Sequence, residues 1–426
     1  MGRRWGGMVL GAAMMLAAAG LVQAQDQDSK DQDIETIKKR LDALEKEKQE
    51  RDAKDAQNQD SGSHGADPAD AKWYDRVHVG GGVRSSFRMQ SEQAPNGRTN
   101  SMGFQLDSGR LYSGGQITDT ISATLNAEFT GSPSVLDAIA EFKFRDEFNI
   151  FAGRLLPACD RANSDGPYYN IAWDFPETSI TFNNATNGFG REDGVTFWGD
   201  VQHFKYWAGA YTGLKNTTLS ADHLQYAARA QYDFWDQEKG YYLSSTYHGG
   251  KEILALGAAV NFQSSTSGTV ADTKNTLNFE VDALFEKKFE FGVPTVEVVY
   301  YYYSRGGYGG NGLGTFGNGN ATTGPAEMGQ GQAFTTTVAW LIPHMIGCGE
   351  FQPLIRYQGY DERSTDATKN PFKNNYDRWD VGLNYVISGH NARIALIYSF
   401  LHHKDAPLPT SEKSDHLLTL GSQVQF

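Results

Sequence analysis

The sequence ends with Asp415-His416-Leu417-Leu418-Thr419-Leu420-Gly421-Ser422-Gln423-Val424-Gln425-Phe426. Counting back from the last residue, one face carries Phe426, Val424, Ser422, Leu420 and Leu418, and the other carries Gln425, Gln423, Gly421 and Thr419. This period of two, with one apolar and one polar face, is typical of a tilted strand that crosses a membrane. We therefore predict an all-β transmembrane barrel that ends on this strand. A soluble β-sandwich that ends on a strand is the alternative.

The N-terminus has the features of a secretory signal. Arg3 and Arg4 precede an apolar run from Met8 to Val22, and Val22-Gln23-Ala24 offers a small-residue cleavage site. The run is too short for a transmembrane helix. We predict that residues 1–24 are a signal peptide and that the chain is exported in a Gram-negative bacterium.

Residues 25–57 are charged and helix-prone. Ile34, Ile37, Leu41 and Leu44 recur at coiled-coil spacing over about two heptads. A helix this short is marginal in isolation, so a self-associating coiled coil and a frayed tail both remain open. We place this segment in the periplasm. Residues 58–76 follow as a predicted flexible linker, rich in Gly, Ser and Asp at its centre.

From residue 77 to residue 426, strand patterns alternate with turns. Ile121–Phe129 is apolar at odd positions and polar at even ones. The same alternation recurs in residues 224–234, 277–286 and 379–387. Short connections alternate with longer ones such as residues 263–274, which is the layout of an up-and-down barrel. Counting back from Phe426 gives roughly sixteen antiparallel strands with both termini periplasmic. Residues 235–250 are long for a periplasmic turn, and the strand count depends on how they are interpreted.

Composition and motifs exclude several classes of function. The formal net charge of -13 argues against nucleic-acid binding, and the mean hydropathy of -0.52 excludes a helical membrane protein. No hydrolase motif surrounds a Ser or His, and His402-His403 lacks a second ligand pair at metal spacing. We predict no catalytic residue, no metal, no cofactor and no enzymatic activity. A barrel with a catalytic rim and an adhesin or structural barrel remain the alternatives to a pore.

A set of short motifs is spread over the predicted barrel. They are Phe151-Ala152-Gly153-Arg154, Asp193-Gly194-Val195, Tyr206-Trp207-Ala208-Gly209-Ala210-Tyr211-Thr212-Gly213, Thr246-Tyr247-His248-Gly249-Gly250-Lys251 and Asp380-Val381-Gly382-Leu383-Asn384-Tyr385. Together they resemble the phosphate-selective porin O and P family, over nearly everything after residue 77. The terminal aromatic resembles the last residue of bacterial outer-membrane barrels. The resemblance implies a multi-pass outer-membrane porin, in contact with lipid and assembled as a homotrimer.

The period of two also assigns an inward face to the barrel wall. Val77, Val79 and Val83 are apolar, so Arg84 and Arg88 are expected to face the lumen. An arginine on the lipid side would cost about 2–4 kcal/mol at the membrane midplane, which favours the same assignment on other strands. The predicted pore-lining and selectivity residues are Arg84, Arg88, Arg110, Arg229, Arg356 and Arg393. The alternative is that these charges only keep the lumen wet and brace the wall.

The connection Leu156–Gly190 is the candidate constriction. The resemblance implies a loop that folds into the lumen, while a surface loop over the barrel mouth is the alternative. The candidate constriction residues are Asp160, Arg161, Asp165, Asp174 and Glu177. Four of these are carboxylates, whereas the resemblance implies a basic pathway with lysines in phosphate-selective members.

The function predicted from these features is an outer-membrane channel for passive or selective diffusion of small hydrophilic solutes. Ion transport with a preference for anions or phosphate is the first candidate. A channel for small neutral or nitrogenous solutes, such as amides, is the second. Cys159 and Cys348 are expected at opposite ends of an apolar band about 25 Å tall, which exceeds the roughly 7 Å between Cα atoms that a disulfide spans. We therefore predict two free thiols.

Overall fold

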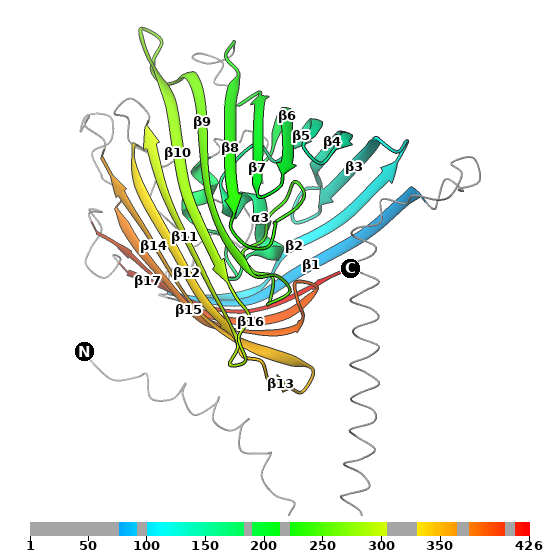
Figure 1. Ribbon diagram of the computed structural model, residues 1–426. Helices are drawn as coiled ribbons and strands as arrows, with labels where there is room; N and C mark the ends of the chain where they lie inside the picture. Colours follow the sequence, from blue (N-terminus) through cyan, green and yellow to red (C-terminus); the bar gives the residue numbers. More distant parts are fainter. Residues whose placement is uncertain are drawn as a thin grey trace, which may run out of the picture. The chain divides into compact units, whose positions relative to one another are not determined.

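The computed structural model describes residues 76–91, 100–182, 190–213, 222–304, 330–363, 375–404 and 414–426. The predicted signal peptide (1–24), the helical segment (25–57) and residues 58–75 of the predicted linker lie outside the described residues. The described part is almost entirely antiparallel β-sheet. The predicted barrel of roughly sixteen strands is confirmed (Figure 1).

Sixteen strands of the described residues build the wall of one closed sheet. They are β1 (Val77–Gln90), β2 (Ser101–Gln116), β3 (Ile121–Glu128), β4 (Ser134–Arg145), β5 (Phe148–Leu155), β6 (Glu192–Val201), β7 (Phe204–Tyr211), β8 (Gln225–Asp233), β9 (Ile253–Thr269), β10 (Asp272–Glu286), β11 (Val293–Ser304), β12 (Gly331–Leu341), β14 (Gly349–Glu362), β15 (Tyr376–Ser388), β16 (Ala392–His403) and β17 (Ser414–Gln425). A two-residue strand, β13 (Met345–Ile346), lies in the turn between β12 and β14. The barrel closes because β1 pairs with both β2 and β17, so no edge strand is left unpaired.

The strands alternate between an apolar outer face and a mostly polar inner face. In β17, Leu418, Leu420 and Val424 are exposed on the outside, while Thr419 and Gln423 are buried inside. The period of two predicted for this strand is therefore confirmed. Because the outward side chains are apolar on strand after strand, the outer surface is suited to a hydrocarbon environment.

Antiparallel pairing sorts the connections onto two ends. The turn end holds the short turns together with Phe426, whose backbone pairs with Gly81. The loop end holds the connection between β5 and β6. At the same end, the expected long loop at residues 263–274 is wrong. The Ser- and Thr-rich chain continues as a hairpin, with β9 reaching Thr269 and β10 starting at Asp272, because these residues suit extended backbone.

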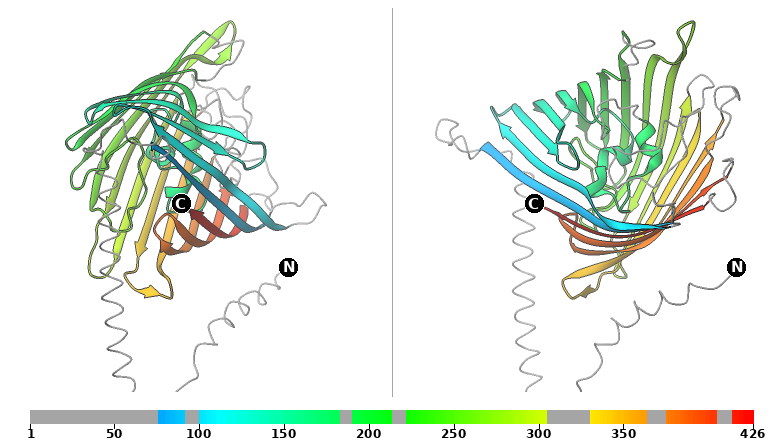
Figure 2. Two further views of the ribbon diagram at one scale, coloured as in Figure 1. Left: turned by 90° about the vertical axis from the view of Figure 1, so that its right-hand side faces the viewer. Right: turned by 180° about the vertical axis from the view of Figure 1, so that it is seen from behind.

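Two helices lie inside the ring of strands, α3 (Arg161–Tyr169) and α4 (Glu177–Phe182), both in the connection between β5 and β6 (Figure 2). Helix α3 is interrupted at Gly166, whose φ of 69° falls in the left-handed region that favours glycine. Neither of the described helices is long and apolar enough to cross a membrane.

Candidate functional site inside the barrel

The connection between β5 and β6 is folded into the barrel rather than over its mouth. We call its residues 156–182 the inserted loop. Nearly all of its side chains that the structure describes are buried, including Trp173 and Tyr168. A buried chain must find hydrogen-bond partners for its backbone carbonyls, and here the barrel wall supplies them from five side chains. The pairs are Arg84 to Trp173 (2.6 Å), Arg393 to Asn170 (2.7 Å), Arg356 to Asp174 (2.8 Å), Asn384 to Ile171 (2.9 Å) and Gln423 to Tyr168 (2.9 Å).

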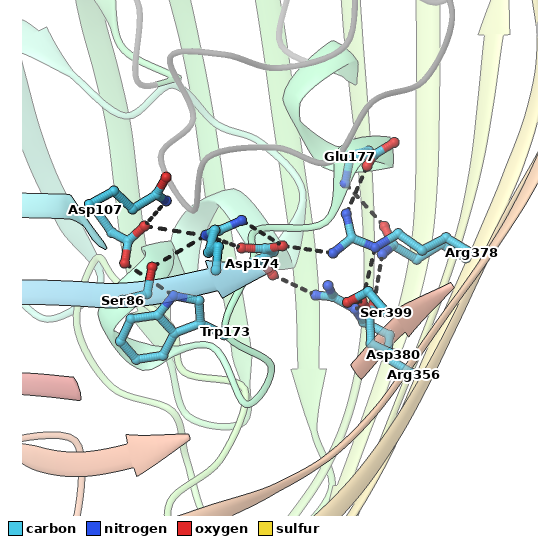
Figure 3. Close-up of polar contacts among 12 residues, drawn as sticks. Ser86, Asp107, Trp173, Asp174, Glu177, Arg356, Arg378, Asp380 and Ser399 are labelled. Atoms are coloured by element: carbon cyan, nitrogen blue, oxygen red, sulfur yellow. Dashed lines mark hydrogen bonds and ion pairs between the residues drawn. The ribbon is translucent and has the colours of Figure 1, made fainter. Parts of the chain in front are cut away.

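Carboxylates of the inserted loop are held by arginines of β1 and β15. The Asp174 carboxylate lies 2.6 Å from Arg88 and 2.8 Å from Arg378. Arg378 also lies 2.8 Å from Glu177 and 2.9 Å from Asp380, and Figure 3 shows it pointing toward both carboxylates. Burial alone would raise the pKa of Asp174, but the guanidinium groups of Arg88 and Arg378 hold it below its ordinary value. These ion pairs fix the loop against the wall.

Trp173 anchors the same part of the loop. Its ring lies 4.2 Å from the Arg84 guanidinium and 5.8 Å from that of Arg393, measured to the ring centroid, which is the range of a cation–π contact. On β17, Gly421 leaves room for the ring, since a Cβ there would approach Trp173 to 2.6 Å. The indole nitrogen donates to Asp107 at 3.3 Å.

On the opposite side, the start of the inserted loop contacts acidic residues of β10 and β11. The Asp160 carboxylate accepts a hydrogen bond from Tyr301 at 2.8 Å, and burial raises the pKa of Asp160 to about 6. Burial, reinforced by Glu297, raises the pKa of Asp165 well above its ordinary value. Both shifts favour the protonated form of the carboxyl group.

A second segment enters the barrel from the turn end. Residues 235–252 between β8 and β9 form no strand, and Tyr241, Leu243 and Ser245 are buried. We call this stretch the second insertion. Its Leu243 amide donates to the Ser164 carbonyl of the inserted loop at 3.3 Å. Arg161 joins the two segments by an ion pair with Glu238, and it also binds Asp282 at 3.1 Å.

Sequence reasoning missed the second insertion. The signal in the sequence is the length of this segment, because a periplasmic turn needs fewer residues. An aromatic cluster accounts for its position. Tyr241 packs on Phe151 (4.8 Å between centroids) and Trp198 (5.6 Å), which point inward from β5 and β6. Large inward-facing aromatic residues need a partner inside the barrel.

The six arginines predicted to line the pore all come from inward-facing positions, but they do not form one open strip. Arg84, Arg88, Arg229, Arg356 and Arg393 are buried. Arg229 lies 2.6 Å from Asp282 and 3.1 Å from Glu280. Arg110 lies apart on β2, paired with Glu128 at 3.0 Å. Their part in selectivity stays a prediction, as does that of the five loop residues.

Arg378 forms ion pairs with two carboxylates of the inserted loop, Asp174 and Glu177. It is not among the pore-lining residues predicted from the sequence. It stands directly before the alternating stretch 379–387. Extending the same period by one residue would have placed it beside Asp380 on the inner face.

The strands β2 to β4 present a different inner surface, which we call the open wall. Ser122, Thr124 and Asn126 of β3 point inward and are only partly buried. Three ion pairs lie on or beside this wall: Arg110–Glu128 (3.0 Å), Lys143–Glu141 (2.8 Å) and Arg191–Asp137 (3.0 Å). Each cation there has a carboxylate from the sheet as its partner.

The two cysteines are far from a common site. Cys159 is buried in the inserted loop, and Cys348 is exposed in the turn between β12 and β14. Both are free thiols. Among the described residues, no group of three or more His, Cys, Asp or Glu side chains is arranged to hold a metal ion.

Comparisons with known proteins place this architecture among porin structures. The chain is similar to OmpF of Salmonella typhi in complex with daunomycin (TM-score 0.54, 12% identity, 82% of this chain and 97% of that chain). It is also similar to an anion-selective porin from Comamonas acidovorans (TM-score 0.53, 13% identity, 82% and 99%). A third is the outer-membrane channel DcaP of Acinetobacter baumannii (TM-score 0.51, 13% identity, 82% and 97%). At these identities the likeness shows the fold.

No protein-family model matches the sequence, and neither does any curated protein. The resemblance to the phosphate-selective subtype therefore stays a prediction. The porin-type barrel itself is supported by the three structures named above.

Proposed function

We propose that the protein is an outer-membrane channel through which small hydrophilic solutes diffuse. The observation that carries this proposal is the contrast between an apolar outer face and a polar, charged inner face on a closed barrel of this strand number. Barrels of sixteen or so strands are wide enough to enclose water. A loop folded into such a lumen narrows it and so limits the size of the solutes that pass.

The preferred solute has two candidates. The sequence predicts anions, with phosphate first, from its inward arginines. Against this, the arginines at Arg88, Arg110, Arg229 and Arg356 each form an ion pair with a carboxylate. A paired guanidinium attracts a passing anion much less than a free one does. This pairing favours the second candidate, small neutral or nitrogenous solutes.

The assembly proposed here is a homotrimer in the outer membrane, with the N-terminal segment in the periplasm. The resemblance found in the sequence supports a trimer. Native mass spectrometry of the detergent-solubilised protein would measure the number of chains directly, and a single-chain species as the only one present would contradict the proposed trimer.

A planar-bilayer recording tests the channel. The purified mature protein is expected to give stepwise conductance increases when added to a bilayer in potassium chloride. Lipid vesicles that contain it should swell in an isotonic solution of a neutral sugar. Correct insertion, verified by protease resistance of the barrel, with neither conductance nor swelling would contradict the proposal.

A further inference from the structure

The inner faces of two parts of the barrel differ in what covers them. Inward side chains of β10 to β12 and of β14 to β17 are almost all buried, many against the two insertions. On β3, by contrast, the inward Ser122, Thr124 and Asn126 keep part of their surface accessible. Among the described residues, solvent therefore reaches the inner face of β3 more than it reaches those strands.

The open wall is rich in hydrogen-bonding groups and carries balanced charge. Ser122 and Thr124 both donate to Glu141, at 2.7 and 2.6 Å, and Asn126 donates to Asp137 at 2.9 Å. The three cations Arg110, Lys143 and Arg191 are matched by the three carboxylates Glu128, Glu141 and Asp137. The charges of these six residues sum to zero.

We propose that solutes cross the barrel along the inner face of β3, beside Ser122, Thr124 and Asn126, and that this route selects small neutral solutes bearing hydroxyl or amide groups. The inference rests on the proposed channel function and names its route and its substrate class.

The physical basis is the exchange of water for protein groups. An ion that enters a narrow passage loses part of its hydration shell, and wall charges that are already paired with one another return little of that energy. A neutral polar solute loses less, and the alternating donors and acceptors of the wall replace its water hydrogen bonds.

A pair of matched cysteine variants tests the route. In a Cys348→Ser background, Thr124→Cys puts a thiol on the open wall, and Thr337→Cys puts one on the inner face of β12, where the threonine is 4% exposed. A negatively charged methanethiosulfonate reagent should reduce the conductance of Thr124→Cys roughly twofold and leave Thr337→Cys unchanged. Ser122→Cys serves as a second open-wall variant if Thr124→Cys does not fold.

Vesicle swelling tests the selection. Glucose and gluconate are similar in size and differ mainly by a carboxylate. The wild-type protein should pass glucose about threefold faster or more. Glu141→Gln frees Lys143 from its partner and should bring the gluconate rate toward the glucose rate. Glu286→Gln is the matched control on β10, because Glu286 is fully buried and bound by Thr246 and Thr295, and it should leave the ratio unchanged.

The outcomes separate this inference from the proposed function. Conductance that is blocked at Thr337→Cys but not at either open-wall cysteine would overturn the route. Equal or faster passage of gluconate in the wild type would overturn the neutral preference. Absence of any conductance or swelling would overturn the channel function itself, and this inference with it.

Discussion

The inner surface of this barrel contains two charged regions of opposite character. On one side, β1, β14, β15 and β16 carry Arg84, Arg88, Arg356, Arg378 and Arg393, all buried under the inserted loop. We call this region the covered wall. On the other side, the open wall carries Arg110 and Lys143, whose strand neighbours on β3 remain partly accessible. Both regions face the lumen, but partly accessible side chains occur on the open wall, at Lys143 and on β3.

The comparison separates two properties that alternation in a sequence does not distinguish. A period of two shows which side chains point into a barrel. Whether such a side chain meets water depends on what else enters the barrel. On the covered wall the arginines bind backbone carbonyls and carboxylates of the loop, so their first role is to hold it in place.

The largest expected difference between the two walls is in the free energy of unfolding that a substitution removes. Arg378→Leu removes the partner of Asp174, Glu177 and Asp380, leaving three buried carboxylates without their shared cation. Loss of one partner from a buried ion pair costs about 3–5 kcal/mol. Denaturant unfolding of the barrel in detergent, followed by tryptophan fluorescence, measures this change.

Lys143→Leu is the matched control on the open wall. The Lys143 side chain is 51% exposed, and exposed ion pairs contribute about 1 kcal/mol or less. Equal losses of unfolding free energy in the two variants would show that the two walls do not differ as described.

The next effect depends on pH. Because burial raises the pKa of Asp160 to about 6, the folded state binds its proton more tightly than the unfolded state, whose Asp pKa is about 3.9. The stability linked to this group is greatest below pH about 4 and is lost as the pH rises through about 6. Asp160→Asn should therefore gain unfolding free energy over the wild type between these limits, by up to about 2–3 kcal/mol. A difference that does not change between pH about 4 and 7 would contradict the shift.

A side chain added at Gly421, next to the Trp173 ring, is expected to lower the unfolding free energy by a smaller amount. Gly421→Val would place side-chain atoms against the Trp173 ring, and overpacking of this kind costs about 1–3 kcal/mol. The channel conductance should also change, since the loop that carries Trp173 must move. Ser422→Val, at the adjacent outward position, should change neither by much. Identical behaviour of the two variants would mean that Trp173 is not held against β17.

The smallest effect is expected on ion selectivity. If the loop carboxylates set the selectivity, their neutralisation should have the larger effect, and if the open wall sets it, Glu141→Gln should. The sequence predicts that neutralising the loop carboxylates increases the anion preference. Arg378, the cation bound to Asp174 and Glu177, is buried, whereas Lys143, the partner of Glu141, is 51% exposed. The double variant Asp174→Asn/Glu177→Gln should therefore shift the anion-to-cation permeability ratio less than Glu141→Gln does. Reversal potentials in a salt gradient measure both. A larger shift in the double variant would restore the loop as the determinant of selectivity.

Sequence patterns were sufficient to predict the barrel and the inward direction of the six arginines. The alternation in Leu418–Val424 and in the other strands follows from local physics, because each side chain faces either lipid or the lumen. Within the predicted constriction Leu156–Gly190, the described residues 156–182 lie inside the barrel, and their part in selectivity stays a prediction. Local patterns do not indicate which inward side chains the two insertions bury. The second insertion, the Arg161–Glu238 link between the two segments and the burial of Arg84 and Arg393 all depend on contacts between residues far apart in the sequence.

The central claim is that charges inside this barrel are balanced along the route of the solutes. The reversal potential of the wild-type protein in a gradient of potassium chloride tests it most directly, because the two ions have nearly equal mobility in water. The account predicts a potential close to zero and thus little discrimination between the ions. A potential near the value for a chloride-selective membrane would contradict it and would show that inward arginines control the passage.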